Sequence, residues 1–229
     1  PISYMSFFSQ MDTYGDGYAG IGVWRAAFKP LVDRIADTDI RLQWFCCDRS
    51  TGVTDASGNR ITLIRDTQSP VAVEYQAVKF IGTGRDNIKA GVFSGWELGD
   101  YIYLRSEEAY MIKMEALAHK GSAEAVTELN SFMKTRQPDY NYTFTNKADL
   151  IEEIIYQKRV EFWGEGLEYI DNRRLNIPVD RTDETWGAEN NNHFSAGKFR
   201  YNQEDRPFLY QLPLSEIENN SQLSPSDQN

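Results

Sequence analysis

Two helical patterns separated by a glycine constrain the fold of this 229-residue chain more than any other feature. The first segment repeats apolar residues at helical spacing: Leu104, Met111, Met114 and Ala118. The second segment has a similar face: Ala123, Val126, Leu129 and Met133. Gly121 is typical of a helix C-terminus and Ser122 of an N-cap. Residues 104–136 therefore predict an antiparallel helix hairpin, which has the size of one tetratricopeptide unit.

Further helices follow this hairpin. Residues 148–163 predict a third helix, with four apolar positions: Leu150, Ile154, Ile155 and Phe162. Gly164 interrupts it, and residues 165–173 predict a fourth helix. Residues 176–229 are rich in Asn and contain prolines, so we expect an irregular, extended tail packed over the helices.

The first part of the chain has a different character. Residues 1–20 are aromatic and glycine-rich, which indicates a loop, and residues 21–36 predict an amphipathic helix despite Pro30. The strand-like stretches "DIRLQWFCC" and "RITLIR" predict a β-hairpin over residues 39–66. The predicted fold is mainly α, with a loop-rich lobe (1–102) that contains a short β-hairpin and a helical part (103–229) that ends in the extended tail.

Composition excludes several classes of function. The net charge of −10 disfavours binding to nucleic acid or to anionic lipid. Cys46 and Cys47 are adjacent, which strains a disulfide, and the two histidines, His119 and His193, lie far apart. No run of about 18 apolar residues is present to span a membrane. We expect no cofactor and no metal.

Two glycine-rich motifs near the start carry little chemistry. "GDGYAG" at residues 15–20 has dinucleotide-type spacing, but the strand–helix–strand context that such a site needs is missing. "DTYGDG" at residues 12–17 resembles the start of a calcium loop, but Val23 stands where the bidentate glutamate is required. Both motifs predict a turn or a ligand loop.

Carboxylates gather in "RVEFWGEGLEYIDNRR", residues 159–174. On a continuous helix Glu161 and Glu165 share one face, and two carboxylates can hydrolyse a glycosidic bond at a separation of ~5–10 Å. Nearby arginines favour a structural reading in which the carboxylates form ion pairs, Trp163 packs inward, and Gly164 and Gly166 allow a close backbone approach.

Aromatic side chains make up 13% of the chain and can form platforms for flat ligands such as sugar rings. Trp24 occupies an apolar helical position and is expected in the core. Four aromatic residues in glycine- or Asn-rich stretches are the predicted ligand contacts: Tyr14, Tyr18, Trp96 and Trp186.

Four blocks of the sequence together resemble the SusD/RagB family. "YIYLRSEEAYMIKMEALAHKGSAEAVTELNSFMKTR" (101–136) is similar to the family's "LRxAExYLxxAEA" helix and the helix after it. "IEEIIYQKRVEFWGEGLEYIDNRR" (151–174) is similar to its "ER…EL…EG.R..DL.R" signature, although Leu167 stands where the family often has Arg. "LYQLPLSEIENNSQLSPSDQN" (209–229) resembles its closing block, with "PLS" in place of "PIP". "PLVDRIADTDIR" (30–41) resembles the stretch that leads to its Asp-x-Arg.

The resemblance implies a surface-exposed lipoprotein of the outer membrane in Bacteroidetes, which has no enzymatic activity. Such proteins capture oligosaccharides or polysaccharides for a TonB-dependent, SusC-like transporter. The lipid anchor and further helix pairs would lie upstream, so that this chain would be the C-terminal portion. Two alternatives stay open: an all-α glycoside hydrolase that uses Glu161 and Glu165, and a helical-repeat scaffold that binds only protein.

Overall fold

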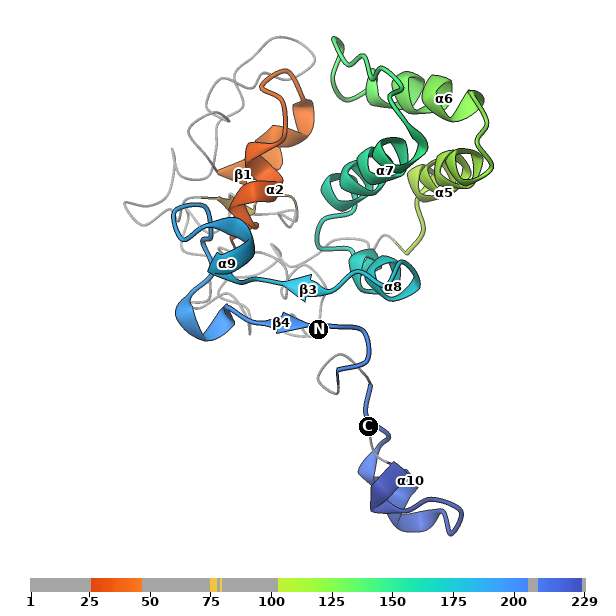
Figure 1. Cartoon of the computed structure of the whole chain (residues 1–229), viewed down its shortest axis with the longest axis vertical. Coiled ribbons are helices and arrows are strands. Elements are labelled where there is room, and N and C mark those ends of the chain that lie inside the picture. Colours follow the sequence, from red (N-terminus) through yellow and green to blue (C-terminus); the bar gives the residue numbers. More distant parts are fainter. Residues whose placement is uncertain (1–25, 47–74, 78, 80–102, 206–209, 228–229) are drawn as a thin grey trace, which may run out of the picture. The chain divides into compact units, whose positions relative to one another are not determined.

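The computed structural model describes residues 26–46, 75–77, 79, 103–205 and 210–227, and these are mainly helical (Figure 1). The chain divides into two compact units, 1–164 and 165–229, which are described separately below. The predicted boundary between residues 102 and 103 stays a prediction, because the residues just before it lie outside the described part. Tyr14, Tyr18, Trp24 and Trp96 also lie outside it.

The predicted helix hairpin is confirmed. Helix α5 spans Ser106–His119 and helix α6 spans Glu124–Met133. Gly121 has a φ of 72°, a left-handed conformation that favours glycine, and the Ser122 hydroxyl accepts a hydrogen bond from Glu124 N at 3.3 Å. The buried apolar residues of the hairpin are Met111, Met114, Ala118, Ala125, Leu129 and Met133.

The predicted faces of this hairpin are wrong at two positions. Leu104 precedes α5 and is exposed, and Ala123 is exposed because Ala125 takes the buried position on α6. A helix repeats every 3.6 residues, so a shift of two positions moves a residue from the inner to the outer face.

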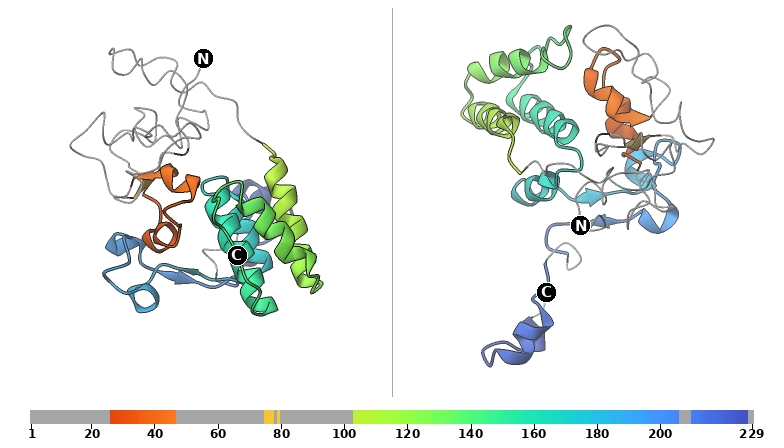
Figure 2. Two further views of the ribbon diagram at one scale, coloured as in Figure 1. Left: turned by 90° about the horizontal axis from the view of Figure 1, so that it is seen from above. Right: turned by 180° about the vertical axis from the view of Figure 1, so that it is seen from behind.

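Helix α7, Lys147–Glu161, packs on α5 (Figures 1 and 2). The side chain of Asn146 caps its first turn by accepting a hydrogen bond from Asp149 N at 3.0 Å. All four apolar positions predicted for this helix are buried: Leu150, Ile154, Ile155 and Phe162.

The helix predicted over residues 21–36 is too long. Of its described residues, 26–28 and 34–36 lie outside the helix that forms. Helix α2 spans only Lys29–Asp33, with Pro30 in its first turn. Phe28 is extended, and Ala27 N donates a hydrogen bond to Tyr75 O at 2.8 Å. Proline has no N–H to give to a preceding helical turn, so it starts this helix and does not continue one.

The β-hairpin predicted over residues 39–66 is wrong in its first stretch, and its second stretch, "RITLIR", lies outside the described residues. Residues Ile40–Trp44 form the 3₁₀ helix η2, because the Asp39 side chain accepts a hydrogen bond from Arg41 N and closes a turn. Strand β1, Phe45–Cys46, pairs antiparallel with β2, Gln76–Ala77. Buried residues of these segments and of α7 form a common core: Ala27, Val32, Ile35, Leu42, Phe45, Tyr75, Ala77, Tyr156 and Val160.

The second unit consists of short elements. Helix α8, Leu167–Arg174, starts two residues later than predicted. The remaining elements are β3 (Val179–Asp180), α9 (Asp183–Trp186), η4 (Ser195–Gly197), β4 (Arg200–Tyr201), α10 (Leu214–Asn219) and η6 (Pro225–Asp227). Strands β3 and β4 pair antiparallel (Figure 1). The predicted tail is thus largely irregular, with brief helices and a two-stranded sheet, and its packing over the helices stays a prediction.

Glycines mark the passage into α8. Gly164 has a φ of 78° and Gly166 a φ of 84°. A Cβ atom on Gly166 would meet no atom within 4 Å. The predicted close backbone approach is therefore wrong at Gly166, where the left-handed backbone is what requires glycine.

Candidate functional site

Glu161, the last residue of α7, is surrounded by arginines. Its side chain is only 1% exposed. Its carboxylate accepts hydrogen bonds from Arg105 Nη1 at 3.1 Å, from Arg136 Nη2 at 3.1 Å and Nε at 3.2 Å, and from Arg41 Nη1 at 3.5 Å. These arginines come from η2, from the residue before α5 and from the segment after α6. Glu161 therefore ties three parts of the first unit together.

Arg41 is itself fully buried and satisfied by other groups. Its Nη2 donates to Asp39 Oδ2 at 2.6 Å and to Gln157 Oε1 at 2.5 Å. A buried guanidinium is tolerated only when opposite charges and acceptors replace its water. The Asp39 and Glu161 carboxylates supply this compensation.

The electrostatics of Glu161 are those of a structural carboxylate. Burial by itself raises its pKa, but hydrogen bonds and charge from Arg136, with the charges of Arg41 and Arg105, outweigh burial and hold the pKa below its ordinary value. A general acid of a glycosidase needs a raised pKa and access to substrate. The structural reading of Glu161 is confirmed, as is the inward packing of Trp163, whose ring makes an edge-on contact with Phe45 at 5.8 Å between centroids.

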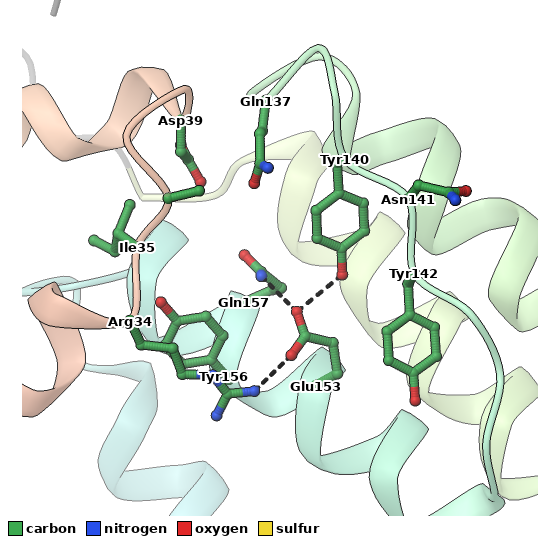
Figure 3. Close-up of a pocket in the computed structure, with 11 residues that line it drawn as sticks. Arg34, Ile35, Asp39, Gln137, Tyr140, Asn141, Tyr142, Glu153, Tyr156 and Gln157 are labelled. Atoms are coloured by element: carbon green, nitrogen blue, oxygen red, sulfur yellow. Dashed lines mark hydrogen bonds and ion pairs between the residues drawn. The ribbon is translucent and has the colours of Figure 1, made fainter.

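A pocket of about 350 Å³ opens elsewhere in the first unit (Figure 3). Its lining comes from the α2–η2 turn (residues 34–39), the α6–α7 connection (residues 134–146) and helix α7. The lining side chains include Arg34, Tyr140, Asn141, Tyr142, Glu153 and Gln157. Polar groups dominate this lining.

Glu153 organises the floor of the pocket (Figure 3). Its Oε1 accepts hydrogen bonds from Tyr140 Oη at 2.9 Å and Gln157 Nε2 at 2.7 Å, and its Oε2 accepts one from Arg34 Nη2 at 2.6 Å. Burial and the negative charge of Glu153 raise the pKa of Tyr140, so its hydroxyl stays protonated and donates. The Arg34 guanidinium also stacks on the Tyr156 ring at 3.9 Å.

Asn130 of α6 fixes the loop that forms one wall. Its Oδ1 accepts a hydrogen bond from Tyr142 N at 2.7 Å, and its Nδ2 donates to Tyr142 O at 3.0 Å. The Asn130 amide thus bonds the N–H and the C=O of Tyr142, the two backbone groups that a neighbouring β-strand would otherwise bond. This wall of the pocket is therefore held in place by contacts within the chain.

Trp186 ends the short helix α9 in the second unit, and its side chain is held in place. The residue is 38% exposed, and its Nε1 donates to Asp180 O at 3.0 Å. The Asp180 carboxylate accepts hydrogen bonds from Thr182, Thr185 and Arg200. Burial opposes ionisation of Asp180, yet these partners keep its pKa below the ordinary value. The exposed part of the indole is thus a fixed aromatic surface.

Sequence reasoning named Trp186 but missed the pocket. The structure places Trp186 in a short helix and not in a loop, and it describes none of the other three predicted contacts. The pocket was missed because its residues come from three distant segments, although the dense tyrosines in "YNYTF" (140–144) were a usable signal. Within the described ranges, no group of three or more His, Cys, Asp or Glu side chains has the geometry to hold a metal ion. No helix in those ranges is long and apolar enough to cross a membrane.

A family model described as the SusD family matches residues 75–229, about two thirds of the chain. The chain belongs to the SusD family. The match includes the α5–α6 hairpin, α7 with Glu161, and the whole second unit of this SusD-family chain. No match was found among curated proteins.

A solved structure shows the same fold. The crystal structure of a SusD-like carbohydrate binding protein from Bacteroides vulgatus superposes with a TM-score of 0.62 at 21% sequence identity. The superposition covers 94% of this SusD-family chain and 44% of that protein. The chain thus spans less than half the length of this relative. The predicted mainly α fold with a helix hairpin is confirmed.

Proposed function

We propose that this chain is part of a non-catalytic, surface-exposed glycan-binding protein of the outer membrane. The single observation that carries the proposal is the SusD family match over residues 75–229. The solved relative of the same fold, described as a carbohydrate binding protein, supports it. The protein would be organised as a loop-rich ligand lobe (1–102) and a helical part (103–229).

Aromatic stacking is the proposed means of capture. Sugar rings present apolar C–H faces that pack on aromatic rings, while polar side chains bond their hydroxyl groups. Trp186 supplies a surface of this kind, because its ring is partly exposed and its Nε1 is anchored on Asp180 O. Tyr14, Tyr18 and Trp96 are proposed as further contacts.

The proposed partner is a TonB-dependent, SusC-like transporter, to which the captured oligosaccharide would be passed. Attachment to the outer membrane would come from a lipid anchor upstream of Pro1. These features are carried over from the family resemblance in the sequence blocks.

A non-enzymatic role is supported by the state of Glu161. This carboxylate is ionised, buried and bound by three arginines, so it has neither the proton nor the access that a glycosidase acid requires. Incubation of the chain with polysaccharides should release no reducing ends. Release that is lost in Glu161→Gln, while circular dichroism shows that the variant is still folded, would instead establish the hydrolase alternative.

Isothermal titration against a panel of oligosaccharides tests the proposal directly. We expect saturable binding to at least one glycan, weakened roughly tenfold by Trp186→Ala through the lost ring stacking. Phe144→Ala is the matched control, since Phe144 is also an exposed aromatic residue but lies in the first unit. Absence of binding to every glycan contradicts the proposal. Copurification with a β-barrel transporter without any affinity for sugar would favour the protein scaffold.

A further inference from the structure

We propose that the pocket between the α2–η2 turn and the α6–α7 connection binds one neutral sugar residue. Every residue that lines it belongs to the first unit, so Trp186 is not part of it. The inference rests on the proposed function, because it takes a glycan as the ligand. It adds a binding site that was not predicted from the sequence.

The size of the pocket limits the ligand. Its volume is about 350 Å³, near the lower end of the ~300–1,000 Å³ that small-molecule sites occupy. One sugar ring with its hydroxyl groups suits this space, whereas a longer stretch of glycan does not. The pocket would therefore hold a chain end or a side branch.

Charge in the pocket favours a neutral ligand. Arg34 is paired with Glu153 at 2.6 Å, and Asp39 is paired with Arg41 at 2.6 Å. Each charged side chain that lines the pocket thus already has a partner of opposite sign. An ionic ligand would have to compete with one of these pairs, whereas hydroxyl groups need no compensating charge.

Hydrogen-bonding groups in the lining suit hydroxyl groups. Glu153 holds Arg34, Tyr140 and Gln157 in fixed orientations, and the Arg34 guanidinium has further N–H groups to donate. The Tyr140 hydroxyl uses its proton on Glu153, so its oxygen can accept from a ligand. Asn141 adds an exposed amide that can both donate and accept.

Apolar surface in the pocket comes from tyrosine rings. Tyr140 and Tyr142 stand side by side on the α6–α7 connection (Figure 3). The apolar C–H face of a sugar can pack on such rings, while the polar groups around the rings bond and orient the hydroxyl groups of the sugar. The combination of rings, a fixed donor set and balanced charge is what a neutral sugar requires.

The methyl group of Ile35 provides a local reporter, since Ile35 lines the pocket and is buried. We would titrate the chain, labelled at isoleucine methyl groups, with glucose, galactose, mannose, xylose and glucuronate, and follow the resonances by NMR. Ile35→Val assigns the Ile35 signal. The expected result is a saturable shift of this signal with at least one neutral sugar, at an affinity at least tenfold higher than for glucuronate.

Variants of lining residues then locate the effect. Ala36→Leu adds bulk to the lining of the pocket and should abolish the shift. Asn141→Ala should weaken binding about two- to tenfold, the effect of one lost hydrogen bond. Thr143→Ala is the matched control, because Thr143 is exposed on the same connection but does not line the pocket. It should bind as the unaltered chain does.

The outcomes separate this inference from the proposed function. If the chain binds an oligosaccharide in the titration but the Ile35 signal does not move, or Ala36→Leu binds equally well, the pocket is not a sugar site and the proposed function stands. Equal affinity for glucuronate overturns the assignment of a neutral ligand. If no glycan and no monosaccharide binds, both proposals fail.

Discussion

Glu161 illustrates how a charged residue can be decisive for a fold without taking part in chemistry. Its carboxylate forms ion pairs with Arg41, Arg105 and Arg136. These ion pairs compensate each charged group for the water that it loses on burial. The sequence block around Glu161 predicted its pairing with arginines. It did not predict which arginines, because none of these three lies in residues 159–174; the most distant, Arg41, is 120 residues away in sequence.

Replacing Glu161 should destabilise the chain strongly. Glu161→Gln keeps the shape but removes the charge that compensates Arg41, and we expect the free energy of unfolding to fall by about 3 kcal/mol or more. Urea denaturation followed by circular dichroism measures this change. Glu152→Gln, on the same helix but 77% exposed, should change it by less than about 0.5 kcal/mol. A loss below about 1 kcal/mol in Glu161→Gln would contradict the structural role.

The contribution of Glu161 to stability should also depend on pH. The pKa of Glu161 is lower in the folded chain than its ordinary value of 4.5, so its stabilising contribution is fully present above pH 4.5. It is lost as the pH falls through the lower, folded pKa. Unfolding free energies measured from pH 7 to pH 3 should therefore show the gap between the unaltered chain and Glu161→Gln closing in acid. A gap that stays constant over this range would argue against the ion pairs.

At the scale of elements, the long periodic segments were predictable and the short ones were not. Helices α5, α6 and α7 follow from apolar spacing, and Gly121 marks the turn between α5 and α6. Residues 40–44 resemble a strand in sequence but form a 3₁₀ helix, because Asp39 closes the turn and Arg41 is drawn into a buried ion pair. The deciding contacts there are local, because Asp39 bonds both the backbone and the side chain of Arg41 and so offers the chain an alternative to a strand.

The turn of the helix hairpin gives a test at this scale. Gly121→Ala should lower the free energy of unfolding by about 1 kcal/mol, because the left-handed backbone is unfavourable for residues with a Cβ. A Cβ atom there meets no atom within 4 Å, so no clash adds to this cost. Chemical denaturation measures the change. Gly121→Asn, which tolerates the conformation better, should lose less, and an equal loss in both variants would point to another cause.

Asn130 should control the order of the α6–α7 connection. Asn130→Ala removes both hydrogen bonds to the backbone of Tyr142, and we expect a loss of about 1–3 kcal/mol in stability. Hydrogen exchange of the Tyr142 amide should accelerate. Asn141→Ala, on the same connection, should leave that exchange unchanged. Unaltered protection of Tyr142 in Asn130→Ala would show that the connection is held by other contacts.

At the scale of the whole molecule, the family and the mainly α architecture were within reach of the sequence, whereas the candidate sites were only partly so. The exposed Trp186 could be named from its loop-like surroundings. The tyrosines of residues 140–144 were a signal for one wall of the pocket, but the whole pocket could not be predicted, because residues 34–39, 134–146 and α7 meet only after folding. Sequence patterns report what is close along the chain, and binding sites are assembled from what is close in space.

Binding should stabilise the whole chain. A ligand that binds only the folded state at 100 times its Kd adds about 2.7 kcal/mol to the free energy of unfolding. We therefore expect the Tm to rise with a glycan that the chain binds, in a concentration-dependent way, as measured by differential scanning calorimetry. Trp186→Ala should need a higher glycan concentration for the same rise. A rise equal to that of the unaltered chain at every concentration would remove Trp186 from the binding surface.

The distance along the chain between Arg41 and Glu161 also has a consequence for synthesis. A ribosome adds about 5–20 residues per second, so Glu161 emerges roughly 6–24 s after Arg41, given the 120 residues between them. During this interval the guanidinium and its neighbours Leu42 and Phe45 have no α7 to pack against. The apolar side chains of this segment therefore stay without their α7 contacts until α7 has been translated. We expect this stretch to be where a nascent chain engages chaperones.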